Sequence, residues 1–131
     1  MKRTKDEGII FNFDPKKGIE DFVDADFAGT WTHEMSNDRT SALSRMGYCV
    51  KIENCPVFWV SKMQTKVVLS TTKAEYTSLY QSARDLLPIK NTVEHLNKFM
   101  NFNSREINTH SAIFEDNARA SQLATKPKFR P

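Results

Sequence analysis

The sequence has few cysteines and no long hydrophobic run, and both absences narrow the class of protein. Its two cysteines, Cys49 and Cys55, match neither the spacing of a zinc knuckle nor that of a redox pair, so reduced thiols are expected. No run of roughly 18 apolar residues exists, which argues against a membrane span. The N-terminus, "MKRTKDEGII", lacks the apolar core of a signal peptide. We therefore expect an intracellular protein that is not secreted and has no membrane partner.

The overall composition is that of an ordinary globular protein. The 131 residues are 39% hydrophobic and 27% charged, with a net charge of +3. This length is enough for one domain with a modest core. The mild positive charge does not by itself indicate a nucleic-acid partner. The expected organisation is an N-terminal extension over 1–18, a folded domain over 19–125 and a basic tail over 126–131.

The periodicity of the apolar residues predicts an α/β protein. Alternating or short apolar runs predict strands at 19–27, 43–52, 55–63 and 111–116, and 66–69 either extends the third strand or forms a short one. After Thr72 the spacing becomes helical, with a predicted buried face of Tyr76, Leu79, Tyr80, Ala83, Leu86 and Leu87. Pro88 should end or kink this helix, a helical stripe resumes over 89–99, and a last helix is predicted at 117–124. This order favours a mixed sheet with helices packed on it.

The predicted strand in "IEDFVDADFAG" (19–29) carries three acids: Asp21, Asp24 and Asp26. A buried carboxylate without a partner is costly, so fixed negative charge in a core usually indicates a metal, a cation or a shifted pKa. The right-handed crossover rule places the strand at 111–116 parallel to an earlier strand. If that strand is the one at 19–27, Asp24 and Asp116 lie on neighbouring strands roughly 5 Å apart.

Glu75, in "STTKAEY", is a third candidate acid. Thr72 and Glu75 have the spacing of a capping box, in which the glutamate bonds back to the amide at the helix start. The residues alone therefore leave two alternatives for Glu75: a helix cap, or a partner of the strand acids.

Four blocks of sequence resemble a known family when taken in order. They are "FVDADFAGTW", "DRTSALSRMGYCV", "CPVFWVSKMQTKVVLSTTKAEYTSLYQSARDLLP" and "IFEDNARASQLATKPKFRP". Together they resemble the ribonuclease H domain of a copia-type LTR retrotransposon polyprotein, from about Gly8 to Pro131. The resemblance implies a ribonuclease H-like fold, a mixed sheet flanked by helices. It implies cleavage of the RNA strand of RNA–DNA hybrids during reverse transcription, in the cytoplasm or in virus-like particles.

The resemblance also assigns residues to this chemistry. The family's metal-binding acids fall on Asp24, Glu75 and Asp116, which are the expected catalytic residues and metal ligands. Mg²⁺ is the expected cofactor, with Mn²⁺ as a substitute, because hard cations prefer carboxylate oxygens. Without metal the three carboxylates should repel, so at least one pKa should be raised. The expected substrate-binding residues are Lys62, Lys66, Lys73, Asn117 and Arg119.

Three further expectations complete this interpretation. Glu115 falls where the family is often not acidic, so no role is expected for it. Trp31 and Trp59 are expected to pack rather than to stack on bases. The expected partners are an RNA–DNA hybrid and the reverse transcriptase and integrase regions of a parent polyprotein.

The sequence departs from the family pattern at its C-terminus. The family has a fourth aspartate downstream, after another strand and at the start of a final helix, whereas this sequence stops at "KPKFRP". The expectation is a truncated copy lacking that strand and helix, with an exposed edge beside the strand at 111–116. Two alternative functions are expected. The chain is either a nuclease with weakened activity that Mn²⁺ supports, or a relic that binds nucleic acid or protein. A partner chain could supply the missing strand by strand addition.

Overall fold

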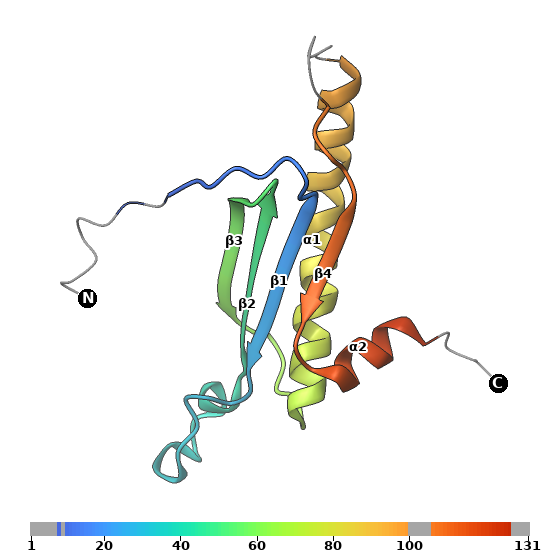
Figure 1. The fold of residues 1–131 in the computed structure, drawn as a ribbon. Coiled ribbons are helices and arrows are strands. Elements are labelled where there is room, and N and C mark those ends of the chain that lie inside the picture. Colours follow the sequence, from blue (N-terminus) through green and yellow to red (C-terminus); the bar gives the residue numbers. More distant parts are fainter. Residues whose placement is uncertain (1–7, 9, 100–105, 127–131) are drawn as a thin grey trace.

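The computed structural model describes residues 8, 10–99 and 106–126 of the chain (Figure 1). Parts of the predicted N-terminal extension (1–7 and 9) and of the basic tail (127–131) lie outside the described residues. None of the helices in the described part is long and apolar enough to cross a membrane. The elements are β1 (Ile19–Asp26), the 3-10 turns η1 (His33–Met35) and η2 (Arg39–Ala42), β2 (Arg45–Ile52), β3 (Cys55–Met63), α1 (Thr71–Phe99), β4 (Ser111–Glu115) and α2 (Ala118–Thr125).

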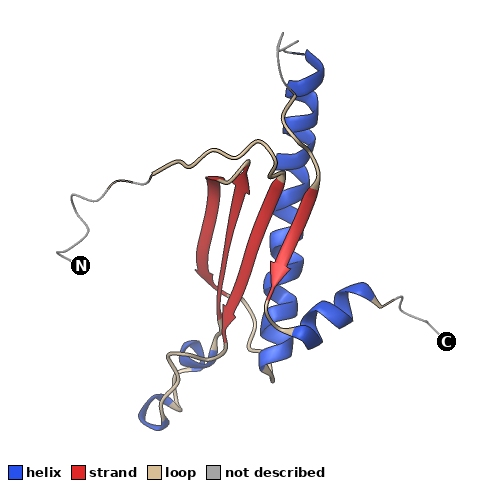
Figure 2. Ribbon diagram, viewed as in Figure 1, coloured by secondary structure: helices blue, strands red, loops and turns tan. Residues whose placement is uncertain are grey.

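The strands form one mixed sheet in the order β3-β2-β1-β4 (Figure 2). The pairs β1–β2 and β2–β3 are antiparallel, and β4 pairs in parallel with β1. The chain reaches β4 through α1, which is the crossover that a parallel pair requires. The predicted α/β class with a mixed sheet flanked by helices is therefore confirmed, and β1 is the earlier strand with which β4 pairs in parallel.

One face of the sheet packs against α1 and carries a small core (Figure 1). One cluster joins Ile19 and Val50 to Leu86 and Val93 of the helix. A second cluster consists of Val23, Met46 and Tyr48, nearer the end of β1. The shorter helix α2 contacts α1 and β4. The core therefore fixes α1 across the sheet, with its N-terminal end near the carboxyl ends of β1 and β4 (Figure 1).

The helix α1 differs from its prediction in length and in its buried face. It runs through Pro88 as one helix, so of the two predicted alternatives, an end or a kink at Pro88, the end is wrong. Its buried residues are Ala74, Glu75, Ser78, Ser82, Leu86 and Val93. By contrast, Tyr80 is 58% and Leu87 59% exposed. The buried face is rotated by about one residue, roughly 100°, from the predicted face. The reason is that polar groups of the sheet and of its connections bind α1. For example, the side chain of Gln64 donates to the carbonyl of Ala74 at 2.9 Å.

The other face of the sheet carries no helix among the described residues. In β3 the alternation of side chains turns Phe58 and Val60 toward α1, so Trp59 points to the open face and is 66% exposed. Trp31 is 51% exposed. The expected packing of both tryptophans is therefore wrong. Residues 66–69 form no strand.

Candidate metal centre

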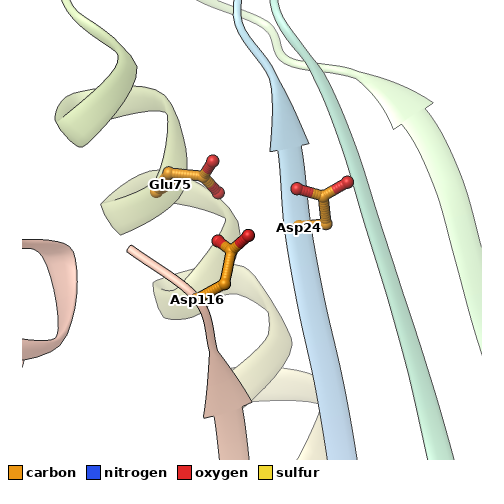
Figure 3. Close-up of side chains that lie close together, drawn as sticks. All are labelled: Asp24, Glu75 and Asp116. Carbon is orange, nitrogen blue, oxygen red and sulfur yellow. The ribbon is translucent and has the colours of Figure 1, made fainter. Parts of the chain in front are cut away.

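Three carboxylates from three different elements meet at the carboxyl ends of β1 and β4 (Figure 3). Asp24 lies near the end of β1 and Asp116 directly follows β4, and the pairing of Val23 with Glu115 makes them neighbours. Glu75 comes from α1. One oxygen from each of the three lies within 4.8 Å of the others. We call these three residues the acid cluster.

The alternative role of Glu75 as a helix cap does not fit the local geometry. The hydroxyl of Ser70, not that of Thr72, accepts the backbone N–H of Lys73, at 3.3 Å. Glu75 lies beyond that first turn, and its carboxylate points toward Asp24 and Asp116 (Figure 3). Because Gly47 faces Asp24 across the β1–β2 pair, no β2 side chain fills the space beside that carboxylate.

Glu75 is a buried member of the acid cluster, and its pKa is raised. This side chain is only 4% exposed, and its pKa is raised to about 7. Burial is the largest cause, followed by the charges of Glu115, Asp24 and Asp116, while a hydrogen bond from the backbone of Ala25 acts in the opposite direction. The rise in pKa that was expected for one of the acids therefore falls on Glu75. Its Oε2 atom is buried without a hydrogen-bond partner.

The chemistry of this donor set fits a hard divalent cation. All three groups offer carboxylate oxygens, which Mg²⁺ and Mn²⁺ prefer. No ion pair in the described part of the chain neutralises them, since the salt bridges found there are Lys17–Glu20 and Lys90–Glu94. The unpartnered oxygen of Glu75 faces into the group. Asp24, Glu75 and Asp116 could therefore hold a divalent metal ion.

The predicted substrate-binding residues are divided between two places. Asn117 and Arg119 lie at the start of α2, opposite the start of α1, and the Oδ1 atom of Asn117 caps α2 by accepting two backbone N–H groups at 3.1 Å. An open cavity of about 530 Å³ separates the two helix starts, lined by Ser70, Thr71, Thr72, Asn117, Ala118 and Arg119. Lys73 is exposed in the first turn of α1, whereas Lys62 and Lys66 are exposed on β3 and the following loop, outside this cavity.

Glu115 is the residue at this site for which no role was expected. Its Oε1 atom accepts the backbone N–H of Asn117 at 3.0 Å, and its Oε2 atom is buried without a partner. Burial is the largest cause of a raised pKa for Glu115, and the charges of Asp116 and Asp24 add to it. Two adjacent acids at the end of a buried strand were the signal for it in the sequence.

The chain is similar in sequence to retrovirus-related polyproteins of plant transposons. It is 29% identical over 126 residues to the retrovirus-related Pol polyprotein from transposon RE2 of Arabidopsis thaliana, which covers 96% of this chain. The polyprotein from transposon RE1 of the same plant is 28% identical over the same share. That from transposon TNT 1-94 of Nicotiana tabacum is 30% identical over 60% of this chain.

The similarity covers only a small part of these relatives. The chain spans about 8% of the two Arabidopsis proteins and 5% of the tobacco protein. No protein-family model and no solved structure matches the chain. The homologues of this chain are thus retrovirus-related Pol polyproteins of plant transposons.

Proposed function

We propose that this chain is a ribonuclease H-type domain of a retrotransposon polyprotein, which cleaves the RNA strand of RNA–DNA hybrids with Mg²⁺, or Mn²⁺ as a substitute. The observation that carries the proposal is the convergence of Asp24, Glu75 and Asp116 from three elements within 4.8 Å. The similarity to retrovirus-related Pol polyproteins from transposons supports the retrotransposon context.

The acid cluster has the properties that this reaction requires of protein residues. Bound divalent ions position a scissile phosphate and lower the barrier to attack by water. The contribution of the chain is to hold such ions on rigid elements, because small displacements of a catalytic group are costly. Asp24 is fixed by the pairing of β1 on both sides, and Glu75 by its burial in α1. Their negative charge offsets the positive charge of the ions beside an anionic substrate.

The cavity between the helix starts supports a phosphate backbone as the ligand. It lies beside Asp116 and is lined by three hydroxyl side chains of residues 70–72 and by Arg119. The N-termini of α1 and α2 both face it, and helix N-termini favour anions. We assign Asn117, Arg119 and Lys73 to contacts with one strand of the hybrid, and Lys62 and Lys66 to its backbone further away. Binding of the hybrid should weaken as the salt concentration rises. Loss of each phosphate contact should reduce the slope of the logarithm of the binding constant against the logarithm of the salt concentration by about 1.

A binding role without catalysis is favoured by one other observation. The open face of the sheet exposes Phe22 and Phe114 on the adjacent strands β1 and β4, and Trp59 on β3. The rings of Phe22 and Phe114 stack with their centroids 4.9 Å apart. Exposed aromatic side chains in such an arrangement are typical of surfaces that bind another molecule. This alternative keeps the acid cluster as a relic of the nuclease.

The deciding experiment is cleavage of an end-labelled RNA–DNA hybrid by the purified chain, in Mg²⁺ and in Mn²⁺. The test variant is Asp24→Asn. The matched control is Asp26→Asn, which removes the same charge two residues further along the same exposed face of β1 and outside the acid cluster. We expect the wild type and Asp26→Asn to cleave only the RNA strand, and Asp24→Asn to be inactive.

The outcomes separate the two candidate functions. If the folded wild type cleaves in neither metal, the nuclease proposal is wrong and the binding role becomes the better one. Equal loss in both variants would show that the charge of the strand, rather than the acid cluster, is required. The reverse transcriptase and integrase regions remain proposed partners, to be tested by binding to this chain.

A further inference from the structure

Glu115 lies beside the acid cluster, on the side that faces α1. It is the last residue of β4 and pairs with Val23 of β1, whose side chain is buried under the helix. In neighbouring parallel strands paired residues point to the same face. Glu115 therefore enters the seam between sheet and helix, whereas Asp24 lies on the open face.

The buried oxygens of this region lack hydrogen-bond donors. Four side-chain atoms in the described part of the chain are buried without a partner: Asp21 Oδ1, Gln64 Oε1, Glu75 Oε2 and Glu115 Oε2. Two of these four belong to Glu75 and Glu115. A buried carboxylate oxygen without a donor is costly. The two oxygens of Glu75 and Glu115 therefore destabilise the folded chain unless a ligand binds them.

Glu115 and Glu75 are also electrostatic neighbours. Among the charges that act on Glu75, Glu115 comes first, ahead of Asp24 and Asp116. Asp116 and Asp24 act on Glu115 in turn. Four carboxylates are thus mutually repelling at one end of the sheet, and no lysine or arginine of the described residues forms an ion pair with them.

The orientation of Glu115 leaves one oxygen available. Its Oε1 atom accepts the N–H of Asn117 at 3.0 Å, which fixes the carboxylate, and its Oε2 atom is buried without a partner. A carboxylate held through one oxygen can bind a cation through the other without a large loss of side-chain entropy.

We propose that Glu115 is a fourth carboxylate ligand of the metal centre, which binds a divalent cation through Oε2 together with Glu75. This inference rests on the proposed metal centre but not on cleavage. Mg²⁺ and Mn²⁺ are the expected ions, because all four groups are hard oxygen donors.

The test is Mn²⁺ binding, measured by the electron paramagnetic resonance signal of free Mn²⁺ in titrations of the purified chain. The variant Glu115→Gln removes the charge but keeps an oxygen that can accept the N–H of Asn117. The matched control is Glu106→Gln, an exposed glutamate outside the four carboxylates. We expect Glu115→Gln to weaken the Kd for Mn²⁺ by tenfold or more, and Glu106→Gln to leave it within twofold.

A second variant separates a ligand from a residue that only positions Asp116. If Glu115 only fixes the turn at Asn117, Glu115→Gln should bind Mn²⁺ like the wild type and Glu115→Ala should bind it more weakly. If Glu115 is a ligand, both variants should bind weakly. Thermal unfolding in EDTA checks folding, and we expect Glu115→Gln to be at least as stable as the wild type because a repulsion is removed.

The failures of the two proposals are distinguishable. Mn²⁺ binding that Glu115→Gln weakens, in a chain that cleaves no hybrid, would uphold the role of Glu115 and refute the nuclease. Cleavage with unchanged Mn²⁺ binding in Glu115→Gln would refute the role of Glu115 alone. A wild type that binds no Mn²⁺ would overturn both the metal centre and this inference.

Discussion

Two groups of acids lie at the contact between β1 and α1, and each contains one buried carboxylate, Glu75 in one group and Asp21 in the other. The acid cluster lies at one end, around Glu75. Seven residues further along the helix, or roughly two turns, Ser82 hydrogen-bonds to the carboxylate of Asp21. Beside it the hydroxyl of Tyr48 donates to Asp85. We call Asp21, Ser82, Tyr48 and Asp85 the sealed network.

The difference between the two groups lies in their donors. In the sealed network each carboxylate accepts a hydrogen bond from a hydroxyl, although Oδ1 of the fully buried Asp21 has no partner. Burial raises the pKa of Asp21, the bond from Ser82 opposes the rise, and the charge of Asp85 adds to it. In the acid cluster the neighbours of Glu75 are other carboxylates. A hydroxyl that donates to a buried carboxylate reduces the cost of burying its charge, whereas converging carboxylates repel one another and favour a bound proton or cation.

The largest expected contrast is in cleavage of the RNA–DNA hybrid. Glu75→Gln removes a charge from the acid cluster and Asp21→Asn removes one from the sealed network. Loss of several kcal/mol of transition-state stabilisation corresponds to on the order of a thousandfold in rate. We expect that loss for Glu75→Gln, measured under single-turnover conditions in Mg²⁺, and a rate within threefold of the wild type for Asp21→Asn. Similar losses of cleavage rate in both variants would mean that cleavage depends on the sealed network as much as on the acid cluster.

The second contrast is in the effect of metal on stability. A ligand that binds only the folded state raises the free energy of unfolding, by about 2.7 kcal/mol at a concentration 100 times its Kd. We expect Mn²⁺ to raise the Tm of the wild type and of Asp21→Asn, and not that of Glu75→Gln, in scanning calorimetry. A matching shift in Glu75→Gln would place the ion elsewhere.

The third contrast is in the pH dependence of the metal-free protein. The pKa of Glu75 is raised from 4.5 to about 7, so the folded chain binds this proton more tightly than the unfolded chain does. The resulting stability is fully present below pH 4.5 and is lost as the pH rises through about 7. We expect the urea midpoint in EDTA to fall between pH 5 and pH 8, and to fall less in Glu75→Gln. The same slope in both proteins would assign the proton to other groups.

The sequence was sufficient to predict the sheet but not the orientation of α1. Alternating runs and the turn between Ile52 and Cys55 defined the antiparallel strands. The crossover rule predicted that the fourth strand is parallel to an earlier one, and its pairing with β1 brings Asp116 beside Asp24. The helical face was predicted from large apolar residues such as Tyr80 and Leu87. It failed because in this chain Ser78 and Ser82 lie in the seam, where Asp21 and Gln64 bond to them. Periodicity shows the spacing of a face but not the partners that a sheet offers to it.

The candidate site was predictable in its acids and less so in their surroundings. Asp24, Glu75 and Asp116 were found through a resemblance, and the structure brings them together. Glu115 was set aside because a family pattern says nothing about a residue that departs from it. Trp59 was assigned to the core because "VFWV" is apolar throughout, although a strand buries alternate residues only.

The smallest expected effect tests whether the sealed network is structural alone. Ser82→Ala removes the hydrogen bond to Asp21 and leaves that fully buried side chain without its donor. Loss of one such bond should cost roughly 1 kcal/mol of the free energy of unfolding, measured by urea denaturation. Ser61→Ala, on the exposed face of β3, is the matched control and should change it by less than about 0.5 kcal/mol. Because Ser82 lies about two turns from Glu75, Mn²⁺ binding should be unchanged in both variants. A weakened Kd in Ser82→Ala would show instead that the hydrogen bond at Asp21 affects the affinity for the ion, and that the two groups of acids are coupled through the seam.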